Sequence, residues 1–203
     1  MMDLFGKKED LNLLPFDGVA SYYGIIFNPR ESKDYFEKLF ASIAWKNDEV
    51  VIYGKRMITK RKTAWYGDSN YLYTYSNVTK EALVWTKDLL ALKKIVEEKS
   101  GSDFNSCLLN LYHDGHDGMA WHSDDEEALG PNPIIASLSF GAPRKFSLKH
   151  KASKQTRSIV LEHGSMLVMK GATQTYWTHS LPKSKLIKTP RINLTFRTIV
   201  KSI

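Results

Sequence analysis

The sequence predicts an α+β fold in which helices come first and an antiparallel β core follows. Residues 31–45 and 79–99 each repeat apolar side chains at helical spacing. After Gly101 the chain divides into short runs of β-forming residues separated by turn residues. Seven or eight such strands, with Gly and Pro between them, are typical of a sandwich or barrel whose interior can hold a small ligand.

Both helices are predicted from one apolar face and from their ends. Residues 31–45 place apolar side chains at positions 35, 36, 39, 40, 43 and 44. For residues 79–99, Thr79 can serve as the N-cap, Glu81 lies near the start, and Gly101 ends the helix. The predicted strands cover residues 107–112, 134–140, 144–150, 157–163, 166–170, 175–181 and 191–200.

Composition indicates a globular protein with an anionic partner. Cys107 is the single cysteine, so the chain has no internal disulfide, which suits a reducing compartment. We find no secretory signal and no apolar run of membrane-spanning length, so we expect an intracellular protein, cytoplasmic, nucleoid-associated or nuclear. The net charge of +7 suits nucleic acid, although a basic surface also serves solubility. Basic residues cluster at 54–62, 148–157 and 182–188.

The segment AWHSDDEEALG places His122 and Asp124 on one side of an extended chain, because side chains alternate along a strand. Two histidines and one carboxylate on one face of a metal are typical of non-haem Fe(II) oxygenases. A third ligand must come from elsewhere, and His179 is the best placed of the remaining histidines, which are His113, His116, His150 and His163. The alternative for His-x-Asp by itself is a hydrogen-bonded polar loop.

The C-terminal segment RINLTFR places Arg191 and Arg197 on one strand face with Asn193 and Thr195, while apolar residues face the other way. Two guanidiniums buried without partners would be very costly. A bound dicarboxylate would supply partners, since guanidinium groups match carboxylates in a bidentate manner. The alternative is an exposed polar face or salt bridges within the chain.

These motifs occur together in the order that a known protein family shows. Residues 50–200 resemble the AlkB family of Fe(II)/2-oxoglutarate-dependent DNA-repair dioxygenases, most closely its branch that acts on double-stranded DNA. The resemblance is carried by YGK (53–55), YGD (66–68), YTYS (73–76), NLYHDGHDGMAWHSDDE (110–126), ASLSFGAPRKF (136–146), HGSMLVM (163–169), THSLP (178–182) and PRINLTFR (190–197). The joint occurrence of HxD, a later His and RxxxxxR in this order is highly specific.

The resemblance implies a double-stranded β-helix (jelly-roll) core over residues 106–203. Residues 1–105 would form an N-terminal extension, helices and a nucleotide-recognition hairpin lid of the same compact catalytic domain. It implies Fe(II) as the metal, with 2-oxoglutarate and O₂ as cosubstrates. The matching residues are His122, Asp124 and His179 for iron, and Asn110, Tyr112, Arg191, Thr195 and Arg197 for 2-oxoglutarate.

The resemblance also implies contacts with a flipped-out base and its duplex. Tyr53 and Gly54 match a hydrophobic hairpin that enters the base stack, with tyrosine in place of the expected phenylalanine. Lys55, Arg61 and Lys62 would contact phosphates, and Arg144, Lys149 and Lys151 would extend that surface. Tyr73 and Tyr75 match the base pocket, and Asp125 and Glu126 match acids beside the base. For the tyrosines the alternative is ordinary cross-strand packing, and for the acids, Glu126 above all, it is solvation in a loop.

The implied activity is oxidative removal of N-methyl groups, such as those of 1-methyladenine and 3-methylcytosine, from DNA, with release of succinate, CO₂ and formaldehyde. Duplex DNA is the favoured partner, single strands fit as well, no membrane is expected, and the protein would be a monomer. Two alternatives stay open: an RNA-directed demethylase of the same family, and a nucleic-acid-binding module without catalysis. We expect His113 and His116 to be loop residues and not ligands, and Cys107 to fill the core.

Overall fold

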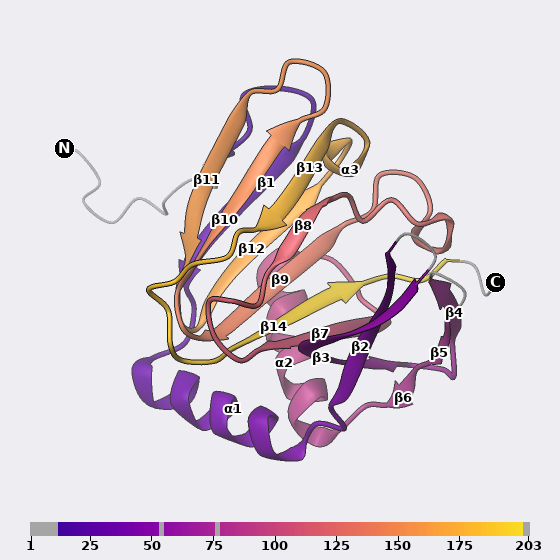
Figure 1. Ribbon diagram of the computed structural model, residues 1–203, viewed down its shortest axis with the longest axis vertical. Coiled ribbons are helices and arrows are strands. Elements are labelled where there is room, and N and C mark those ends of the chain that lie inside the picture. The colour runs from indigo at the N-terminus through magenta and orange to yellow at the C-terminus, as the bar shows by residue number, and fades with distance from the viewer. Residues whose placement is uncertain (1–11, 53–54, 76–77, 201–203) are drawn as a thin grey trace.

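The computed structural model describes residues 12–52, 55–75 and 78–200. Within these ranges strands predominate, and two long helices lie at one side of the molecule (Figure 1). In chain order the elements are β1 (Val19–Ile25), α1 (Pro29–Ser42), β2 (Lys46–Ile52), β3 (Lys55–Gly67), β4 (Leu72–Tyr75), β5 (Val78–Glu81), β6 (Leu83–Val84), α2 (Lys87–Ser100), β7 (Ser106–Tyr112), β8 (Met119–His122), the 3₁₀ turn η1 (Glu127–Leu129), β9 (Ile135–Gly141), β10 (Arg144–His150), β11 (Thr156–Leu161), β12 (Ser165–Lys170), α3 (Thr173–Tyr176), β13 (Trp177–Leu181) and β14 (Arg191–Arg197).

Two sheets, antiparallel except for the β3–β6 pair, face each other and form the jelly-roll core. The larger sheet has the strand order β1-β12-β9-β14-β7-β3-β2, with β6 paired to β3, and the smaller has the order β11-β10-β13-β8. Strands β4 and β5 form a separate pair. The expected mainly antiparallel β fold with helices is therefore confirmed.

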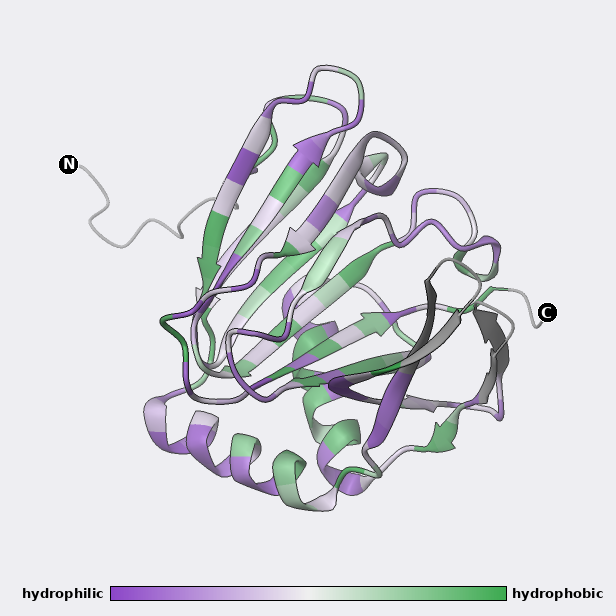
Figure 2. Ribbon diagram, viewed as in Figure 1, coloured by the Kyte–Doolittle hydropathy of each residue, from purple (hydrophilic) through white to green (hydrophobic). Residues whose placement is uncertain are grey.

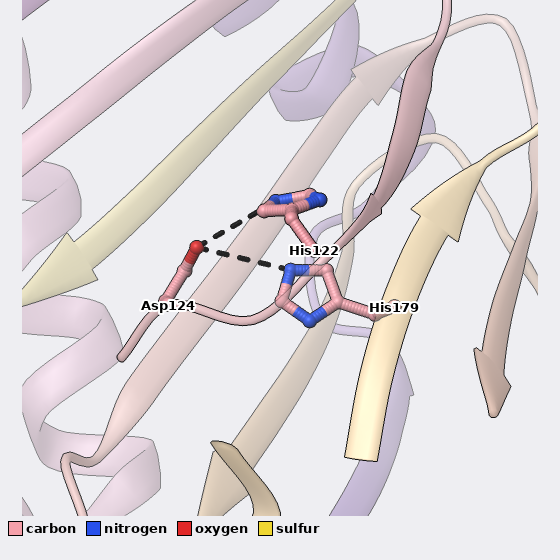
Figure 3. A group of neighbouring side chains, drawn as sticks. All are labelled: His122, Asp124 and His179. Carbon is pink, nitrogen blue, oxygen red and sulfur yellow. Dashed lines mark ion pairs between the residues drawn. The ribbon is translucent and has the colours of Figure 1, made fainter. Parts of the chain in front are cut away.

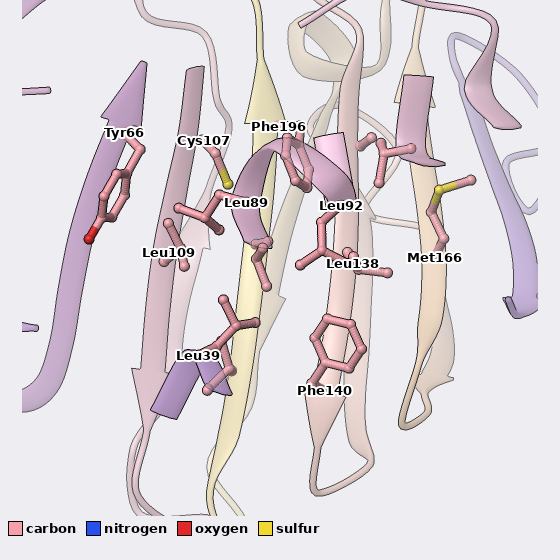
Figure 4. Packing of buried hydrophobic residues seen from close by; sticks show 14 of the residues in the cluster. Leu39, Tyr66, Leu89, Leu92, Cys107, Leu109, Leu138, Phe140, Met166 and Phe196 are labelled. Carbon is pink, nitrogen blue, oxygen red and sulfur yellow. The ribbon is translucent and has the colours of Figure 1, made fainter. Parts of the chain in front are cut away.

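The larger sheet is buried on both faces. On one face, α1 and α2 cover a cluster that includes Leu39, Leu89, Leu92, Leu109 and Phe196 (Figure 4). On the other face, a second cluster fills part of the space between the sheets and includes Leu148, Leu161 and Trp177. Burial of these side chains supplies the main favourable free energy of folding. In Figure 2, α1 carries both purple and green residues, as expected of a helix with one buried face.

The two helices are present, but the second begins later than the sequence predicts. Asn28 caps α1 in a capping box with Glu31. The N-cap of α2 is Thr86, whose hydroxyl accepts from the Leu89 backbone N–H at 3.2 Å. Thr79 lies instead in β5, opposite Thr74 of β4. Gly101 ends α2 with a φ of 66°, as predicted.

The N-terminal part of the chain contributes more strands than the sequence predicts. β1 pairs with β12, and β3 pairs with β7, so segments before residue 105 complete both flanks of the larger sheet. The expected order of helices followed by strands is thus wrong for this region. No described helix is long and apolar enough to cross a membrane.

Candidate metal and cosubstrate site

His122, Asp124 and His179 converge at one end of the space between the sheets (Figure 3). β8 and β13 are neighbours in the smaller sheet, and His122 stands opposite His179 in their pairing. Asp124 follows the end of β8 and turns back toward both rings, with Oδ1 at 3.6 Å from His122 Nε2 and 3.9 Å from His179 Nε2. The three ligand atoms lie within 4.8 Å of one another, close enough for one metal ion to bind all three.

Hydrogen bonds fix the orientation of these groups. The Asp124 backbone N–H donates to Gln174 Oε1 at 2.9 Å, and the Ser123 hydroxyl donates to the Trp177 carbonyl at 3.1 Å. His122 Nδ1 lies 2.8 Å from the Ala120 carbonyl, which assigns the proton to Nδ1 and leaves Nε2 with a free lone pair.

Electrostatics prepares the group for a cation. Burial alone would raise the pKa of Asp124, but the neighbouring Arg197, His179 and His122 hold it below its ordinary value. Burial lowers the pKa of His179 to about 4. At neutral pH the site therefore presents a carboxylate and a neutral imidazole, which are the protonation states that metal binding requires.

The other histidines lie outside this group. His113 and His116 are exposed and contact Asp117 and Asp114 of their own loop. His150 contacts Asp17, and His163 Nδ1 accepts from the Gly141 N–H at 2.9 Å. Among the residues that the structure describes, His122, Asp124 and His179 form the one group suited to a metal. The structure thus brings His179, and none of the other four histidines, beside His122 and Asp124.

A cavity of about 80 Å³ adjoins the group between the two sheets. Its wall is formed by alternate residues of two neighbouring strands, since side chains in a strand alternate between faces. The lining residues from these two strands are Leu108, Asn110 and Tyr112 of β7 and Arg191, Asn193, Thr195 and Arg197 of β14. The remaining lining residues are the three candidate ligands together with Met119, Ile135, Ser137, Phe146, Met169 and Leu181.

Arg191 is buried at one side of the cavity, with 2% of its surface exposed. Its Nη2 donates to Ser139 Oγ at 2.8 Å and to Asn193 Oδ1 at 2.7 Å. Its Nε has no hydrogen-bond partner, nor does Oδ1 of Asn110. Burial lowers the pKa of Arg191 to about 10, and the charge of nearby Arg144 acts in the same direction. A carboxylate entering the cavity would relieve both effects.

Arg197 lies at the metal end. Its Nη1 is 4.0 Å from Asp124 Oδ2 and 3.5 Å from Glu126 Oε1. The two arginines therefore face the cavity from one strand, as the alternation in RINLTFR predicts. Both are buried, so the alternative of an exposed polar face is excluded.

The residues predicted to contact nucleic acid differ in their exposure and in how much of them the structure describes. Asp125 is exposed and pairs with Lys151 at 3.6 Å, whereas Glu126 turns toward Arg197 and is not a freely solvated acid. Tyr53 and Gly54 lie outside the described residues. For Lys55 in β3, and for Tyr73 and Tyr75 in β4, the structure describes the strand only.

Two arginines predicted to contact phosphates are buried instead. Arg61 is paired with Asp48 inside the protein. Burial would lower the pKa of Arg61, yet Tyr112 and Asp48 raise it, so the guanidinium remains charged. Arg144 donates to the carbonyls of Asp114, Asp117 and Pro182, and so fixes the loops around residues 113–118 and 182. Neither guanidinium is placed to contact an external phosphate.

Asn193, which the alternation in RINLTFR places on the arginine face, also lines the cavity. Three further residues near the site were not predicted from the sequence. Met119, Ser137 and Gln174 come from segments whose closeness to the site depends on strand pairing, which sequence spacing does not reveal.

Comparison with known proteins agrees with this geometry. Residues 19–197 match the 2OG-Fe(II) oxygenase superfamily. The mouse DNA oxidative demethylase ALKBH2 is 37% identical over 205 residues, which cover 96% of this chain and 86% of that protein. The chain belongs to the AlkB family of these oxygenases.

Other relatives and a solved structure fit the same family. The bovine alpha-ketoglutarate-dependent dioxygenase alkB homolog 3 is 43% identical over 180 residues, and the human protein of that name is 41% identical over 191 residues. These matches cover 84% and 89% of this chain but only 62% and 66% of the relatives. The structure of OsALKBH1 shares the fold, with a TM-score of 0.62 at 14% identity, over 91% of this chain and 99% of that one.

Proposed function

We propose that this AlkB-family chain is an Fe(II)- and 2-oxoglutarate-dependent dioxygenase that removes N-methyl groups from damaged bases in DNA. The observation that carries the proposal is a candidate metal group, His122, Asp124 and His179, beside a buried arginine, Arg191, with an unpaired Nε. A metal site next to a buried cation suits a cosubstrate that offers one end to the metal and a carboxylate to the arginine.

His122, Asp124 and His179 would hold the iron. Three protein ligands leave open positions for a bidentate cosubstrate and for O₂. The assigned tautomer of His122 directs Nε2 toward the site, and the low pKa of His179 keeps its imidazole available at neutral pH. These residues need no large rearrangement to bind a cation.

The cavity residues would hold 2-oxoglutarate. Arg191 would bind the carboxylate far from the metal, since its Nε lacks a partner. Arg197 would serve the metal end, where it already lies near Asp124. Asn110, Tyr112 and Thr195 line the same wall, and the unpaired Oδ1 of Asn110 would bind a polar hydrogen or a water.

Iron and 2-oxoglutarate, when bound, supply the oxidising chemistry: one atom of O₂ enters succinate as CO₂ is lost, and the other hydroxylates the methyl carbon, which leaves the base as formaldehyde. The protein contributes orientation and a water-excluding cavity. Phe146, Met119 and Leu181 supply apolar wall to this cavity beside the candidate ligands.

Nucleic acid is the proposed substrate class, with duplex DNA favoured. Relatives of this chain are named DNA oxidative demethylases, and the chain carries a net charge of +7. Asp125, with its exposed side chain, is the acid better placed to face a cationic methylated base, whereas Glu126 would act mainly through Arg197. Tyr73 and Tyr75 are proposed to hold the base, Tyr53 and Gly54 to enter the stack, and Lys55 to contact phosphate.

The test measures formaldehyde and succinate from oligonucleotides that contain 1-methyladenine or 3-methylcytosine, as single-stranded DNA, duplex DNA and RNA. We expect equimolar succinate and formaldehyde, with most product from DNA. His122→Ala should abolish turnover while retaining most of the DNA affinity, and His113→Ala, on the exposed loop, serves as the matched control. Product from RNA alone would replace the DNA proposal. No product from any substrate, with metal bound, would leave the binding-module alternative.

A further inference from the structure

A run of four acids, residues 124–127, begins two positions after His122, and only its first member lies with the two histidines of the candidate metal group. Residues 123–126 lie between the end of β8 and η1 and belong to neither element. Within this described segment, neither a strand ladder nor a helix sets which carboxylate turns inward. The direction of such a segment depends on hydrogen bonds from other parts of the chain.

The side chain of Gln174 supplies one of these hydrogen bonds. Its Oε1 accepts the Asp124 backbone N–H at 2.9 Å, and only 2% of the Gln174 surface is exposed. Its Nε2 lies 3.7 Å from Sδ of Met169, which lines the cavity. Beside it, the Ser123 hydroxyl donates to the Trp177 carbonyl at 3.1 Å. The segment is thus anchored twice, next to its first acid, by residues that lie close together in the chain.

Gln174 lies in α3, a short turn between β12 and β13 that is fixed from two sides. Thr173 Oγ1 accepts the Val19 backbone N–H at 2.9 Å, which joins the turn to β1. Lys151, which follows β10, donates from Nζ to the Gln174 carbonyl at 2.9 Å and from its backbone N–H to the Tyr176 carbonyl at 2.7 Å. Gln174 is therefore a well-anchored support for the acid run.

The second acid of the run points away from the metal group. Asp125 Oδ2 lies 3.6 Å from Lys151 Nζ, and 62% of the Asp125 side chain is exposed. For Asp124 the exposed fraction is 12%. Two neighbouring acids therefore have opposite settings, and the backbone N–H that Gln174 holds belongs to the buried one.

We propose that Gln174 is a positioning residue of the candidate metal group: by holding the Asp124 backbone N–H, it selects Asp124 from the acid run and directs its carboxylate at the two histidines. The proposal rests on the proposed function, because it takes these three residues as the ligands of the iron. Hydrogen bonds of the outer shell orient metal ligands, so the loss of one lowers metal affinity while every ligand remains present.

The first experiment measures the Kd of Co(II) without O₂, since the visible absorption of Co(II) also reports its coordination geometry. Gln174→Met keeps an unbranched side chain of the same length but has only a weak acceptor. Its Kd should rise about tenfold, and its absorption bands should change, because the carboxylate is misdirected. Gln174→Glu keeps an oxygen acceptor and should restore both the affinity and the wild-type spectrum. Thr175→Ala, at an exposed position of the same turn, is the matched control and should match the wild type.

An unchanged Kd in Gln174→Met would overturn the proposal, as would an equal loss of affinity in Gln174→Glu. Urea unfolding of each metal-free variant shows whether it is folded. If Gln174→Met does not fold, Gln174→Asn takes its place with the same expected loss, because its amide is one methylene shorter and cannot reach the Asp124 N–H.

A double-mutant cycle separates positioning from a general disturbance of the structure. Asp124→Ala leaves the two histidines, which should bind Co(II) more weakly than the complete group. Adding Gln174→Met to Asp124→Ala should weaken Co(II) binding no further, because both changes act through one carboxylate. Additive losses would show that Gln174 acts on the histidines or on the fold, and would overturn the proposal.

Selection among the acids is tested by Asp125→Ala, which should leave the Kd of Co(II) unchanged. A loss as large as that in Asp124→Ala would show that Gln174 does not select Asp124. Failure of the proposed function gives a different result: Co(II) affinity would depend on Gln174 as expected, yet the protein loaded with Fe(II) and 2-oxoglutarate would release no formaldehyde from any methylated oligonucleotide.

Discussion

Arg197 Nη1 lies 4.0 Å from Asp124 Oδ2, so an arginine that lines the cavity also compensates the charge of a carboxylate in the candidate metal group. This contact joins two motifs that are 73 positions apart in the chain. It also explains how a carboxylate with only 9% of its surface exposed stays ionised before any metal binds.

Removing this arginine should therefore make the thermal stability of the protein depend more strongly on a bound cation. Arg197→Gln leaves the Asp124 charge buried with less compensation, at a cost of about 3–5 kcal/mol by analogy with other broken buried pairs. A metal replaces the missing positive charge, so Mn(II) should raise the melting temperature of the variant more than that of the wild type. Thermal unfolding with and without Mn(II) measures both shifts, and Arg30→Gln, at an exposed arginine at the start of α1, provides the control. Equal shifts in the two proteins would contradict this account.

Replacing Arg191 should weaken the binding of 2-oxoglutarate without lowering the stability of the ligand-free protein. Its guanidinium is buried with no carboxylate partner among the described residues, and burial lowers its pKa. Arg191→Met removes this charge and keeps an unbranched apolar stem, so the ligand-free melting temperature should stay the same or rise. The affinity for 2-oxoglutarate should fall at least tenfold, because a charge-assisted hydrogen bond contributes about 1.5–3 kcal/mol. A large loss of ligand-free stability would speak against the cavity as an anion site.

Ligands should stabilise the wild type through the candidate site. Mn(II) and 2-oxoglutarate at 100 times their Kd should each add about 2.7 kcal/mol by mass action. For a chain of this size that corresponds to a rise of roughly 5–10 °C in melting temperature. Asp124→Ala should lose the response to Mn(II), while His116→Ala, on the exposed loop, should keep it. A full response in Asp124→Ala would place the metal elsewhere.

His163 should contribute to the pH dependence of stability. Burial lowers its pKa from the ordinary value of 6.5, and its Nδ1 accepts the Gly141 N–H only when unprotonated. Below pH 6.5 the unfolded chain binds a proton that the folded chain does not, so stability falls as the pH falls through this range.

His163→Gln retains an acceptor for the Gly141 N–H but cannot titrate. The loss of unfolding free energy between pH 7.5 and pH 5.5, measured in urea, should therefore be smaller in this variant than in the wild type. His113→Gln, an exposed histidine, is the control and should leave the loss unchanged. An identical loss in His163→Gln would show that its titration does not contribute.

Local sequence pattern was sufficient for much of the fold and site. Alternation in RINLTFR directs Arg191 and Arg197 to one face because a strand has a period of two, whatever surrounds it. The apolar periodicity of 31–45 and the glycine at 101 likewise act through nearby residues, and the structure has helices at both places. His-x-Asp brings two ligand types together within three residues, so its chemistry could be proposed before the fold was known.

Pairing between distant segments decided the rest. Thr79 lies in a strand and Thr86 caps α2 because β4 and β5 pair, which local propensity does not report. Arg61 looks like a surface cation in the run TKRK, and only the bulge between β2 and β3 turns it inward to Asp48. Residue type and local period were enough to predict the candidate ligands for a metal and for a dicarboxylate. Tertiary structure alone decided which cations are buried beside them, because burial and strand register arise from contacts between segments far apart in the chain.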